Sequence, residues 1–371
     1  MIDYELQGPR SEERSRIRLV SALREGRFPQ SVLIDGPAGV GKKKLAMGIV
    51  QALMCTHPEH RPCGACFGCK MAMNPEVVDN WLLPLAAKEA SAKAASEATS
   101  KTTAKTVEDY TQEYVAKVFE NPYAIDYLPP GATISVELVR SLTKRFALKS
   151  SGVRCVIVAE AERMNISAAN AFLKTLEEVP PNTYFILTTT SRDLLLETIR
   201  SRCLSLHLQP WTDAEVRAEL DKREIEVNDD VLGLSLGSPG RAMFFNEYAA
   251  KFTELSAVFI CDSLAGEFSK ILRLVEEEVS NKTLGDVNGA TLFLDVLSFL
   301  LTDILRKQAG LDVRLPETIG KLSERALELS PVALHEALKN VQETSKIIAG
   351  RSVNVLVALQ ALAIKLFDGY R

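Results

Sequence analysis

The sequence has no uninterrupted apolar stretch of about 20 residues, which is the length that a membrane-spanning helix needs. Its most apolar segment, residues 292–305, is interrupted by Asp295 and Asp303. The N-terminal segment also lacks the apolar core of a secretory signal peptide. We therefore predict a cytoplasmic protein with no membrane partner.

An excess of basic charge is absent as well. The chain has 44 lysines and arginines against 48 acidic residues, which gives a net charge of −4. A protein that coats nucleic acid by itself needs a concentrated basic surface. The charge balance therefore excludes this class, although it leaves open a local or shared contact with DNA.

What is present is an alternation of short apolar runs with helical patterns. Four runs are typical of buried strands, and they cover residues 31–36, 154–161, 183–190 and 204–210. The helical patterns between them are about a dozen residues long. This alternation indicates an α/β fold, with a parallel sheet covered by helices on both faces. After Pro210 the patterns are helical and no further strand is expected.

The 371 residues are enough for two or three domains. We assign the sheet domain to residues 1–210, and helical regions to 211–250 and 251–371. The segment from about 84 to 130 differs in composition, because residues 86–99 hold seven alanines among Lys, Glu and Ser. Few of its side chains are suited to a core, so we expect an exposed helix or a flexible insertion.

The segment "GPAGVGKK" follows the phosphate-binding pattern G-x-x-x-x-G-K-[ST] except at its last position. Gly36, Gly41 and Lys42 are in place, Gly39 lies between the outer glycines, and Lys43 stands where Ser or Thr is usual. The backbone N–H groups of such a loop cradle anions, and Lys42 would face the β- and γ-phosphates. A strand pattern before the loop and a helical pattern after it favour a nucleotide-binding loop. The alternative is a glycine-rich turn with no ligand.

Both protein ligands for magnesium are missing. Nucleotide hydrolases hold this ion with the loop hydroxyl and with an acidic residue at the end of a second strand. Lys43 replaces the hydroxyl, and Ala159 replaces the first acid of the pair that ends in Glu160. We therefore predict no magnesium site, weak or absent ATP binding, and no hydrolysis of ATP by this chain alone.

Seven cysteines in a cytosolic chain indicate metal binding or burial more than disulfides. Four of them are spaced C-x7-C-x2-C-x2-C within residues 55–70, and these are Cys55, Cys63, Cys66 and Cys69. Four thiolates can enclose a tetrahedral zinc ion at about 2.3 Å each, and a site filled by protein ligands is structural. Gly64 and Gly68 permit the sharp turns. His57 or His60 replacing one cysteine is the alternative.

Two arginines are candidate phosphate contacts. Arg202, in "SRC" just before the last strand pattern, can reach a phosphate held by a neighbouring subunit, as an arginine finger does. Arg241, in "GSPGRA", opens a helix and can sense a phosphate in the loop. The alternatives are a surface salt bridge for Arg202 and a solvent-exposed helix start for Arg241.

Taken in order, these motifs resemble the clamp-loader branch of the AAA+ proteins. The resemblance rests on "LIDGPAGVGK", the four cysteines, "AERMNISAANAFLKTLEEVPPNTYFILTT", "LLETIRSRC" and "GSPGRA". It covers residues 1 to about 250 apart from the insertion. The C-terminal region shares only its helical pattern with the branch. Lys43 and Ala159 fit the non-hydrolysing members better than the ATP-hydrolysing ones. Asn74-Pro75-Glu76 stands where the branch often has His-Pro-Asp.

The resemblance implies a role for each segment and site. Residues 1–210 would be the AAA+ P-loop domain, 211–250 a small helical lid and 251–371 an all-α collar used for oligomerisation. Arg202 would be the finger presented to the ATP site of an adjoining motor subunit, and Arg241 the second sensor. Thr189 lies near the first sensor position, and the four cysteines match the structural zinc cluster.

The implied function is to help load the sliding clamp onto primed DNA during replication. The implied partners are motor (gamma/tau-like) subunits and a clamp-opening, delta-like subunit in a hetero-pentamer, together with the clamp and, through the assembly, primed DNA. The chain would then be a component of a DNA-directed DNA polymerase holoenzyme with no ATPase activity of its own.

Three alternative functions are less consistent with the residues. An ATP-hydrolysing motor subunit would need the magnesium ligands that Lys43 and Ala159 replace. A zinc-containing nucleic-acid-binding module would need a basic face beside the cysteines. Residues 55–70 contain one arginine, Arg61, and one lysine, Lys70. A small-molecule phosphotransferase would need an acceptor pocket and metal ligands, and the sequence indicates neither.

Overall fold

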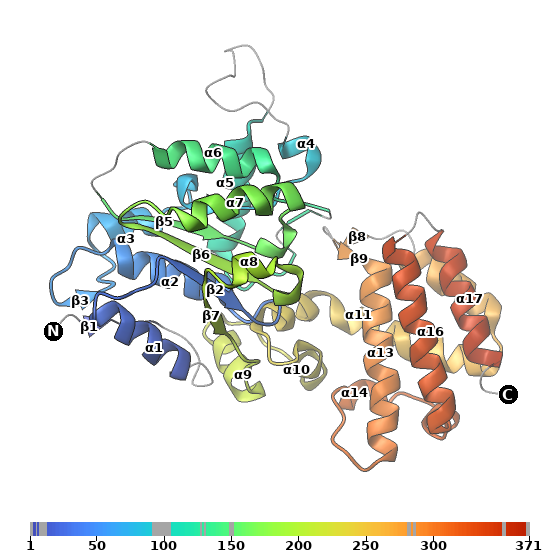
Figure 1. The fold of residues 1–371 in the computed structure, drawn as a ribbon. Coiled ribbons are helices and arrows are strands. Elements are labelled where there is room, and N and C mark those ends of the chain that lie inside the picture. The colour runs from blue at the N-terminus through green and yellow to red at the C-terminus, as the bar shows by residue number, and fades with distance from the viewer. Residues whose placement is uncertain are drawn as a thin grey trace. The chain divides into compact units, whose positions relative to one another are not determined.

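The computed structural model describes residues 3–4, 6, 13–90, 105–126, 128–129, 131–147, 152–279, 283–284, 287–350 and 354–368 (Figure 1). The chain divides into two compact units. The first unit contains residues 1–215 with 237–240, and the second contains 216–236 with 241–371. No helix within the described ranges is both long and apolar enough to cross a membrane.

A five-stranded, all-parallel sheet forms the centre of the first unit, in the order β4-β5-β6-β2-β7. Its strands are β2 (Ser31–Asp35), β4 (Trp81–Leu82), β5 (Arg154–Val158), β6 (Thr183–Thr189) and β7 (Leu204–His207). The four predicted strands are confirmed. The two-residue strand β4 was not predicted, because so short a run carries no periodicity.

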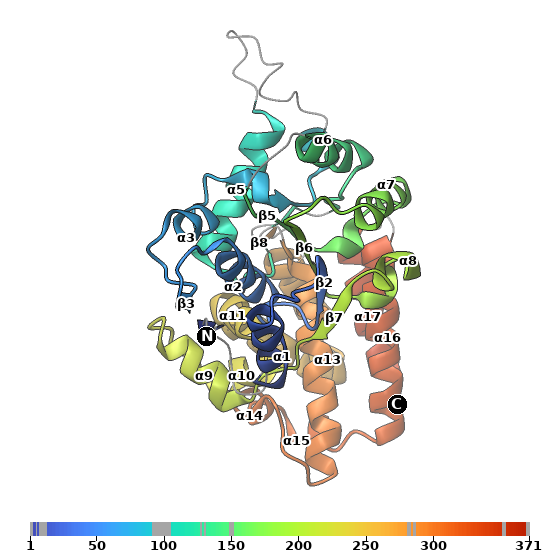
Figure 2. The same cartoon turned by 60° about the vertical axis from the view of Figure 1, so that its left-hand side comes forward.

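Helices cover both faces of this sheet, as predicted. Side chains alternate between the faces of a strand. Val156, Val158 and Phe185 therefore face one layer, where they join a core with α6 (Val136–Ala147) and α7 (Ile166–Glu177). Helix α2 (Lys42–Met54) lies against β2, β5 and β6 on the opposite face (Figures 1 and 2). This arrangement confirms the α/β fold class.

Smaller elements complete the first unit. Its remaining helices are α1 (Glu13–Arg24), α3 (Phe67–Ala72), α4 (Ala87–Ala90), α5 (Val107–Glu120), α8 (Glu197–Arg200) and the start of α9 (Asp213–Asp221). Among the described residues of this unit, single-turn helices lie at Val78–Asn80, Ala161–Arg163 and Arg192–Leu194. Strands β1 (Asp3–Tyr4) and β3 (His60–Arg61) form a separate parallel pair.

The predicted insertion is in part an integral element of the first unit. Helix α5 begins with a capping box, in which the Thr106 and Asp109 side chains each accept a backbone N–H of the other. Its Tyr114, Val115 and Val118 side chains are buried. The expectation that few side chains of this segment fill a core is therefore wrong for α5, whereas residues 91–104 lie outside the described residues.

The described part of the second unit is mainly helical. Its helices are α10 (Asp229–Ser235), α11 (Pro239–Ala265, from Arg241), α12 (Phe268–Leu274), a π-helical turn (Val275–Val279), α13 (Gly289–Gln308), α14 (Pro316–Ile319), α15 (Glu324–Leu327), α16 (Pro331–Gly350) and α17 (Val355–Asp368). Helix α13 is buried along most of its length and packs against α16. It therefore forms the centre of this unit.

For this part of the chain, the sequence predicted no further strand and a domain boundary at residue 250. An antiparallel pair of two-residue strands, β8 (Thr283–Leu284) and β9 (Val287–Asn288), contradicts the prediction of no strand after Pro210. Such short pairs leave no alternating pattern in the sequence. Helix α11 runs without a break across the predicted boundary at residue 250, so a lid and a collar as separate domains stay a prediction.

Candidate functional site

The phosphate loop lies between the buried strand β2 and helix α2, as the motif requires. Gly39 and Gly41 have φ angles of +74° and +104°, in the region that favours glycine. A Cβ atom on Gly36 would lie 2.6 Å from the carbonyl oxygen of Leu208, so no larger residue fits there. The glycines of the motif therefore serve the backbone path of the loop whether or not a ligand binds.

The amine of Lys42 is bound by the loop itself. Its Nζ donates to the carbonyl oxygens of Gly36 at 2.7 Å and Pro37 at 2.6 Å. Burial, and next the charge of Lys43, lower the pKa of Lys42 to about 8. The amine that the motif would direct at the β- and γ-phosphates thus donates its hydrogen bonds to carbonyl groups of the chain.

The amine of Lys43 also has a partner within the chain. Its Nζ donates to the carbonyl oxygen of Ala124 at 2.8 Å, and the residue is buried. Burial lowers the pKa of Lys43 to about 8, against the opposing effect of Glu160. The position of the usual magnesium-binding hydroxyl therefore carries an amine that reaches a carbonyl group 81 residues away in the chain.

The end of β5 carries the residues that stand in place of the usual acid pair. Ala159 follows β5 and is fully buried, and Glu160 pairs with Arg163 at 2.7 Å. Thr188 and Thr190 line the cavity beside the loop, whereas the Thr189 hydroxyl accepts the N–H of Ser191. Thr188 and Thr190, but not Thr189, thus point to the cavity, because side chains alternate along β6. A place for Thr189 near the first sensor position stays a prediction.

The cavity at the loop is small, with a volume of about 150 Å³. It is lined by Ala38, Gly39, Gly41, Lys42, Lys43, Pro122, Ala124, Ile125, Glu160, Arg163, Thr188 and Thr190. Pro122, Ala124 and Ile125 were not predicted from the sequence as residues of this site. The available signal was a short apolar group following an Asn-Pro turn, within a segment otherwise taken for an insertion.

The buried lysines predict an unusual pH dependence. The folded chain releases the Lys42 proton near pH 8, and the unfolded chain keeps it to about pH 10.5. Between these values the unfolded state binds more protons, so the free energy of unfolding rises with pH. Relative to Lys42→Met, the native chain should gain about 2 kcal/mol between pH 8 and pH 10.

This gain can be measured by urea unfolding followed by tryptophan fluorescence. Both tryptophans, Trp81 and Trp211, belong to the first unit, so the signal reports on the unit that holds the loop. The matched control is Lys144→Met, an exposed lysine on α6, which should leave the pH profile unchanged. A native-minus-variant difference that stays flat from pH 8 to pH 10 would contradict the burial of a proton-releasing amine.

The four predicted cysteines converge on one point. Their sulfur atoms all lie within 4.8 Å of one another, with Sγ–Sγ distances of 3.9 Å for Cys63–Cys69 and 3.8 Å for Cys55–Cys66. Tetrahedral ligands at about 2.3 Å from an ion are separated by about 3.8 Å. The cluster can therefore hold a metal ion with four thiolate ligands.

The local backbone supports this cluster. Backbone N–H groups donate to three of the sulfurs, including that of Cys69 to Cys66 Sγ at 3.4 Å. Backbone hydrogen bonds lower the pKa of Cys66 to about 5, which favours its thiolate. His57 Nδ1 instead accepts the N–H groups of Glu59 and His60, so its ring is used within the turn. The geometry thus favours four cysteines over a set containing His57.

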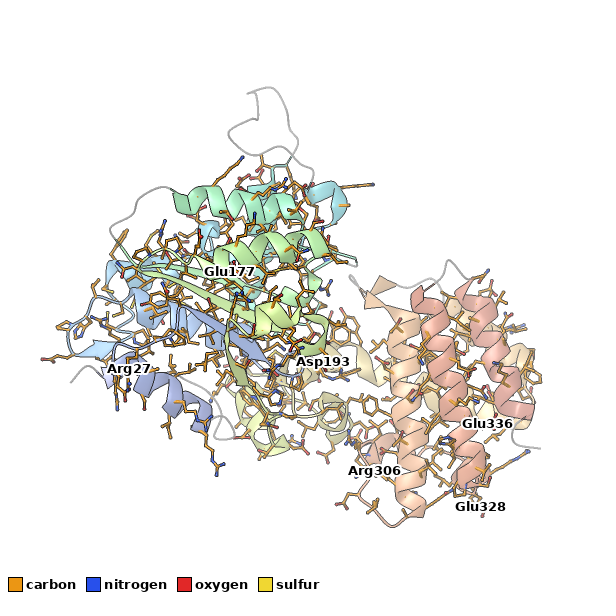
Figure 3. The ribbon with its side chains drawn as sticks, viewed as in Figure 1. Arg27, Glu177, Asp193, Arg306, Glu328 and Glu336 are labelled. Carbon is orange, nitrogen blue, oxygen red and sulfur yellow. The ribbon has the colours of Figure 1, made fainter. Side chains whose placement is uncertain are left out.

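Arg202 lies at the surface between α8 and β7. Its guanidinium donates to Glu177 at 2.6 Å and to the carbonyl oxygen of Thr198 at 3.0 Å, and 36 % of its side chain remains exposed. Figure 3 labels Glu177 in the first unit. An arginine in this state is held in position yet accessible, so it can meet an anion of another molecule. Its role as a finger stays a prediction.

Arg241 lies in the second unit and is half-buried. Its guanidinium approaches the carbonyl oxygen of Leu234 at 3.4 Å and lies 5.2 Å from the Phe245 ring. Burial lowers the pKa of Arg241, and the nearby Asp295 opposes this shift. These contacts give the residue a structural role within its own unit. A role as second sensor stays a prediction.

Comparison with known proteins extends these findings. Residues 12–212 match the family described as DNA polymerase III, delta subunit. The chain is 27 % identical over 340 residues to DNA polymerase III subunit delta' of Escherichia coli K12, covering 87 % of this chain and 84 % of that protein. It is 22 % identical over 368 residues to the delta' subunit of Bacillus subtilis 168, covering 95 % and 94 %.

A third relative, DNA polymerase III subunit tau of B. subtilis 168, is 27 % identical over 205 residues, covering 55 % of this chain and 29 % of that protein. These matches confirm the resemblance to clamp-loader subunits that the motifs indicated. The family match spans the parallel sheet, the degenerate phosphate loop, the four cysteines and Arg202. The chain therefore belongs to the DNA polymerase III, delta subunit family.

Proposed function

We propose that this chain is a delta'-type subunit of a clamp loader, which does not hydrolyse ATP and which presents Arg202 to the ATP bound by an adjoining motor subunit. The observation that carries the proposal is the contrast between two sites. The chain's own loop lacks both magnesium ligands, at Lys43 and Ala159, whereas the Arg202 guanidinium is ordered and exposed. A subunit built in this way contributes to catalysis only at a neighbour's site.

The metal that we propose for the cysteine cluster is zinc. Four thiolates with tetrahedral spacing suit zinc, and a site filled entirely by protein ligands has no open position for a reaction. The cluster joins the end of α2 to α3, where a Cβ atom on Gly68 would lie 1.9 Å from the Met54 carbonyl oxygen. Zinc would therefore fix the close approach of these two helices.

We propose that the second unit assembles with the motor and clamp-opening subunits as part of a collar. Helices α16 and α17 leave apolar side chains exposed, namely Val332 and Ile347 on α16 and Val357 and Ile364 on α17. Exposed apolar side chains on packed helices are suited to subunit interfaces. The sliding clamp and primed DNA would be contacted through this cytoplasmic assembly.

Reconstitution tests the proposed function directly. We expect the isolated chain to release no phosphate from magnesium-ATP, because nothing in its loop holds the ion. Clamp loading onto primed DNA by motor and clamp-opening subunits should require the chain. Lys42→Ala identifies contaminating activity, because it would leave a contaminant's turnover unchanged. Magnesium-dependent turnover by the isolated chain that Lys42→Ala abolishes would instead identify a motor subunit.

A further inference from the structure

An ordered turn of the chain lies against the phosphate loop. Segment Asn121–Asp126 follows α5 directly. Within it, the Asn121 side chain accepts the N–H of Tyr123 at 3.1 Å, and the Asn121 carbonyl accepts the N–H of Ala124 at 3.0 Å. Tyr123 is 1 % exposed and Ala124 is 9 % exposed. The turn is therefore part of the folded core.

Two lysines at the start of α2 donate hydrogen bonds to this segment. Lys43 Nζ donates to the Ala124 carbonyl oxygen at 2.8 Å, and Lys44 Nζ donates to the Tyr123 hydroxyl at 2.8 Å. The Lys44 amine also lies 5.0 Å from the centroid of the Tyr123 ring. Hydrogen bonds from charged donors are stronger than neutral ones, and more so away from water. The first turn of α2 therefore binds the segment with two cations.

The segment also packs directly on the glycines of the loop. A Cβ atom on Gly41 would lie 3.0 Å from the Tyr123 ring, and one on Gly39 would lie 2.9 Å from Ile125 Cγ2. The Tyr123 ring in turn packs edge-on against Trp211, with 5.9 Å between the ring centroids. Glycines allow a ligand to approach the backbone closely. In this loop, side chains of the protein itself occupy that space.

The space that remains beside the loop is small. The cavity of about 150 Å³ is bounded on one side by Pro122, Ala124 and Ile125. Pockets that bury most of a drug-sized ligand are about 300–1,000 Å³. The segment therefore takes up space beside the loop in which the phosphates of a nucleotide would lie.

We propose that segment Asn121–Asp126 is a permanent internal occupant of the phosphate loop, so that the loop binds its own chain in place of a nucleotide. Lys43 stands at the hydroxyl position because its amine anchors this occupant. The inference goes beyond the proposed function, which concerns the neighbour's ATP and leaves the ligand of this loop open. It does not depend on the role of Arg202, whose test reads hydrolysis in another subunit.

Nucleotide binding by the native full chain is the first test. Titration of fluorescent ATP and ADP analogues with magnesium should show no saturable binding tighter than about 1 mM. Amide hydrogen exchange of residues 121–126 should be the same with and without nucleotide. Saturable micromolar binding, or faster exchange of the segment when nucleotide is added, would show a displaceable lid and overturn the proposal.

Lys43→Met is the second test, because methionine keeps a long buried side chain and removes only the amine. Loss of a charged hydrogen bond should raise exchange at Tyr123 and Ala124 by about tenfold to a hundredfold. The matched control, Lys144→Met, replaces an exposed lysine of the same unit and should leave this exchange unchanged. Equal exchange in the native chain and Lys43→Met would refute the anchor. The nucleotide titration decides independently if this variant does not fold.

Discussion

Arg202→Ala should slow ATP hydrolysis at the adjoining motor site by about a thousandfold or more, which is the contribution of an arginine finger to phosphoryl transfer. The guanidinium would neutralise charge that develops on the transferred phosphate. In a reconstituted loader, a single-turnover measurement of phosphate release with clamp and primed DNA should lose the amplitude of one motor site. Assembly should persist, because the Arg202–Glu177 pair is solvent-exposed and contributes at most about 1 kcal/mol to folding.

Arg145→Ala is a matched control for this experiment. Arg145 is an arginine of the same unit that pairs with Asp79, and its side chain is 39 % exposed against 36 % for Arg202. Its loss removes a similar surface ion pair far along the chain from the "SRC" motif. Equal single-turnover amplitudes for native, Arg145→Ala and Arg202→Ala assemblies would remove the finger assignment.

Cys66→Ser should release the metal and weaken the first unit. Metal analysis of the native protein should give about one zinc per chain, and the variant should give close to none. Structural zinc contributes about 10–16 kcal/mol to the folding of zinc-finger peptides, so we expect a loss on the order of 5 kcal/mol here, where the unit has a core of its own. Urea unfolding followed by the fluorescence of Trp81 and Trp211 measures this loss in the unit that contains the cluster.

Cys261→Ser separates the metal effect from general loss of a thiol. Cys261 is a partly exposed cysteine of the second unit, and its Sγ contacts the Ser323 hydroxyl at 3.7 Å. Its replacement should change neither the zinc content nor the tryptophan transition. A native protein that folds without metal and unfolds at the same urea concentration as Cys66→Ser would rule out the structural site.

The predictions for Cys66 and Arg202 concern charged groups in opposite surroundings. At the cluster, backbone N–H groups donate to three of the four sulfurs, and the proposed zinc ion would stabilise all four as thiolates. At Arg202, the cation is left accessible and is matched by a single exposed carboxylate, Glu177. The first arrangement closes a site within the chain. The second leaves a charge available for another subunit, which suits a protein whose own loop contains no magnesium ligand.

Prediction from sequence worked where the signal was local. The strands around Leu33, Val156 and Phe185 were predicted because parallel strands buried on both faces are continuous apolar runs. The cysteine cluster was predicted because thiolates at CxxC spacing have few other uses in a chain of this kind. Lys43 and Ala159 were identified at the positions of the usual magnesium ligands because each position has a fixed offset within a motif.

Prediction failed where the contact joined distant segments. For α5 the sequence predicts an exposed helix or a flexible insertion, since its apolar residues Tyr114, Val115 and Val118 are few and lie among charges. In the fold, these three side chains are buried. The hydrogen bond from Lys43 to Ala124 joins residues 81 positions apart, and no pattern within either segment predicts it.

The amino-acid sequence by itself determined the class of this protein: a P-loop fold with Lys43 and Ala159 at the positions of the usual magnesium ligands, a four-cysteine cluster and an arginine in the "SRC" motif. These features follow from residue type and short-range spacing, which a linear pattern contains. Only the tertiary structure decided what occupies the phosphate loop. The side chain at position 43 could be identified from the sequence as a missing hydroxyl, but its partner is set by the packing of α5 and the following turn. Long-range packing depends on the whole core, and so the loop's occupant became evident only when the chain was folded.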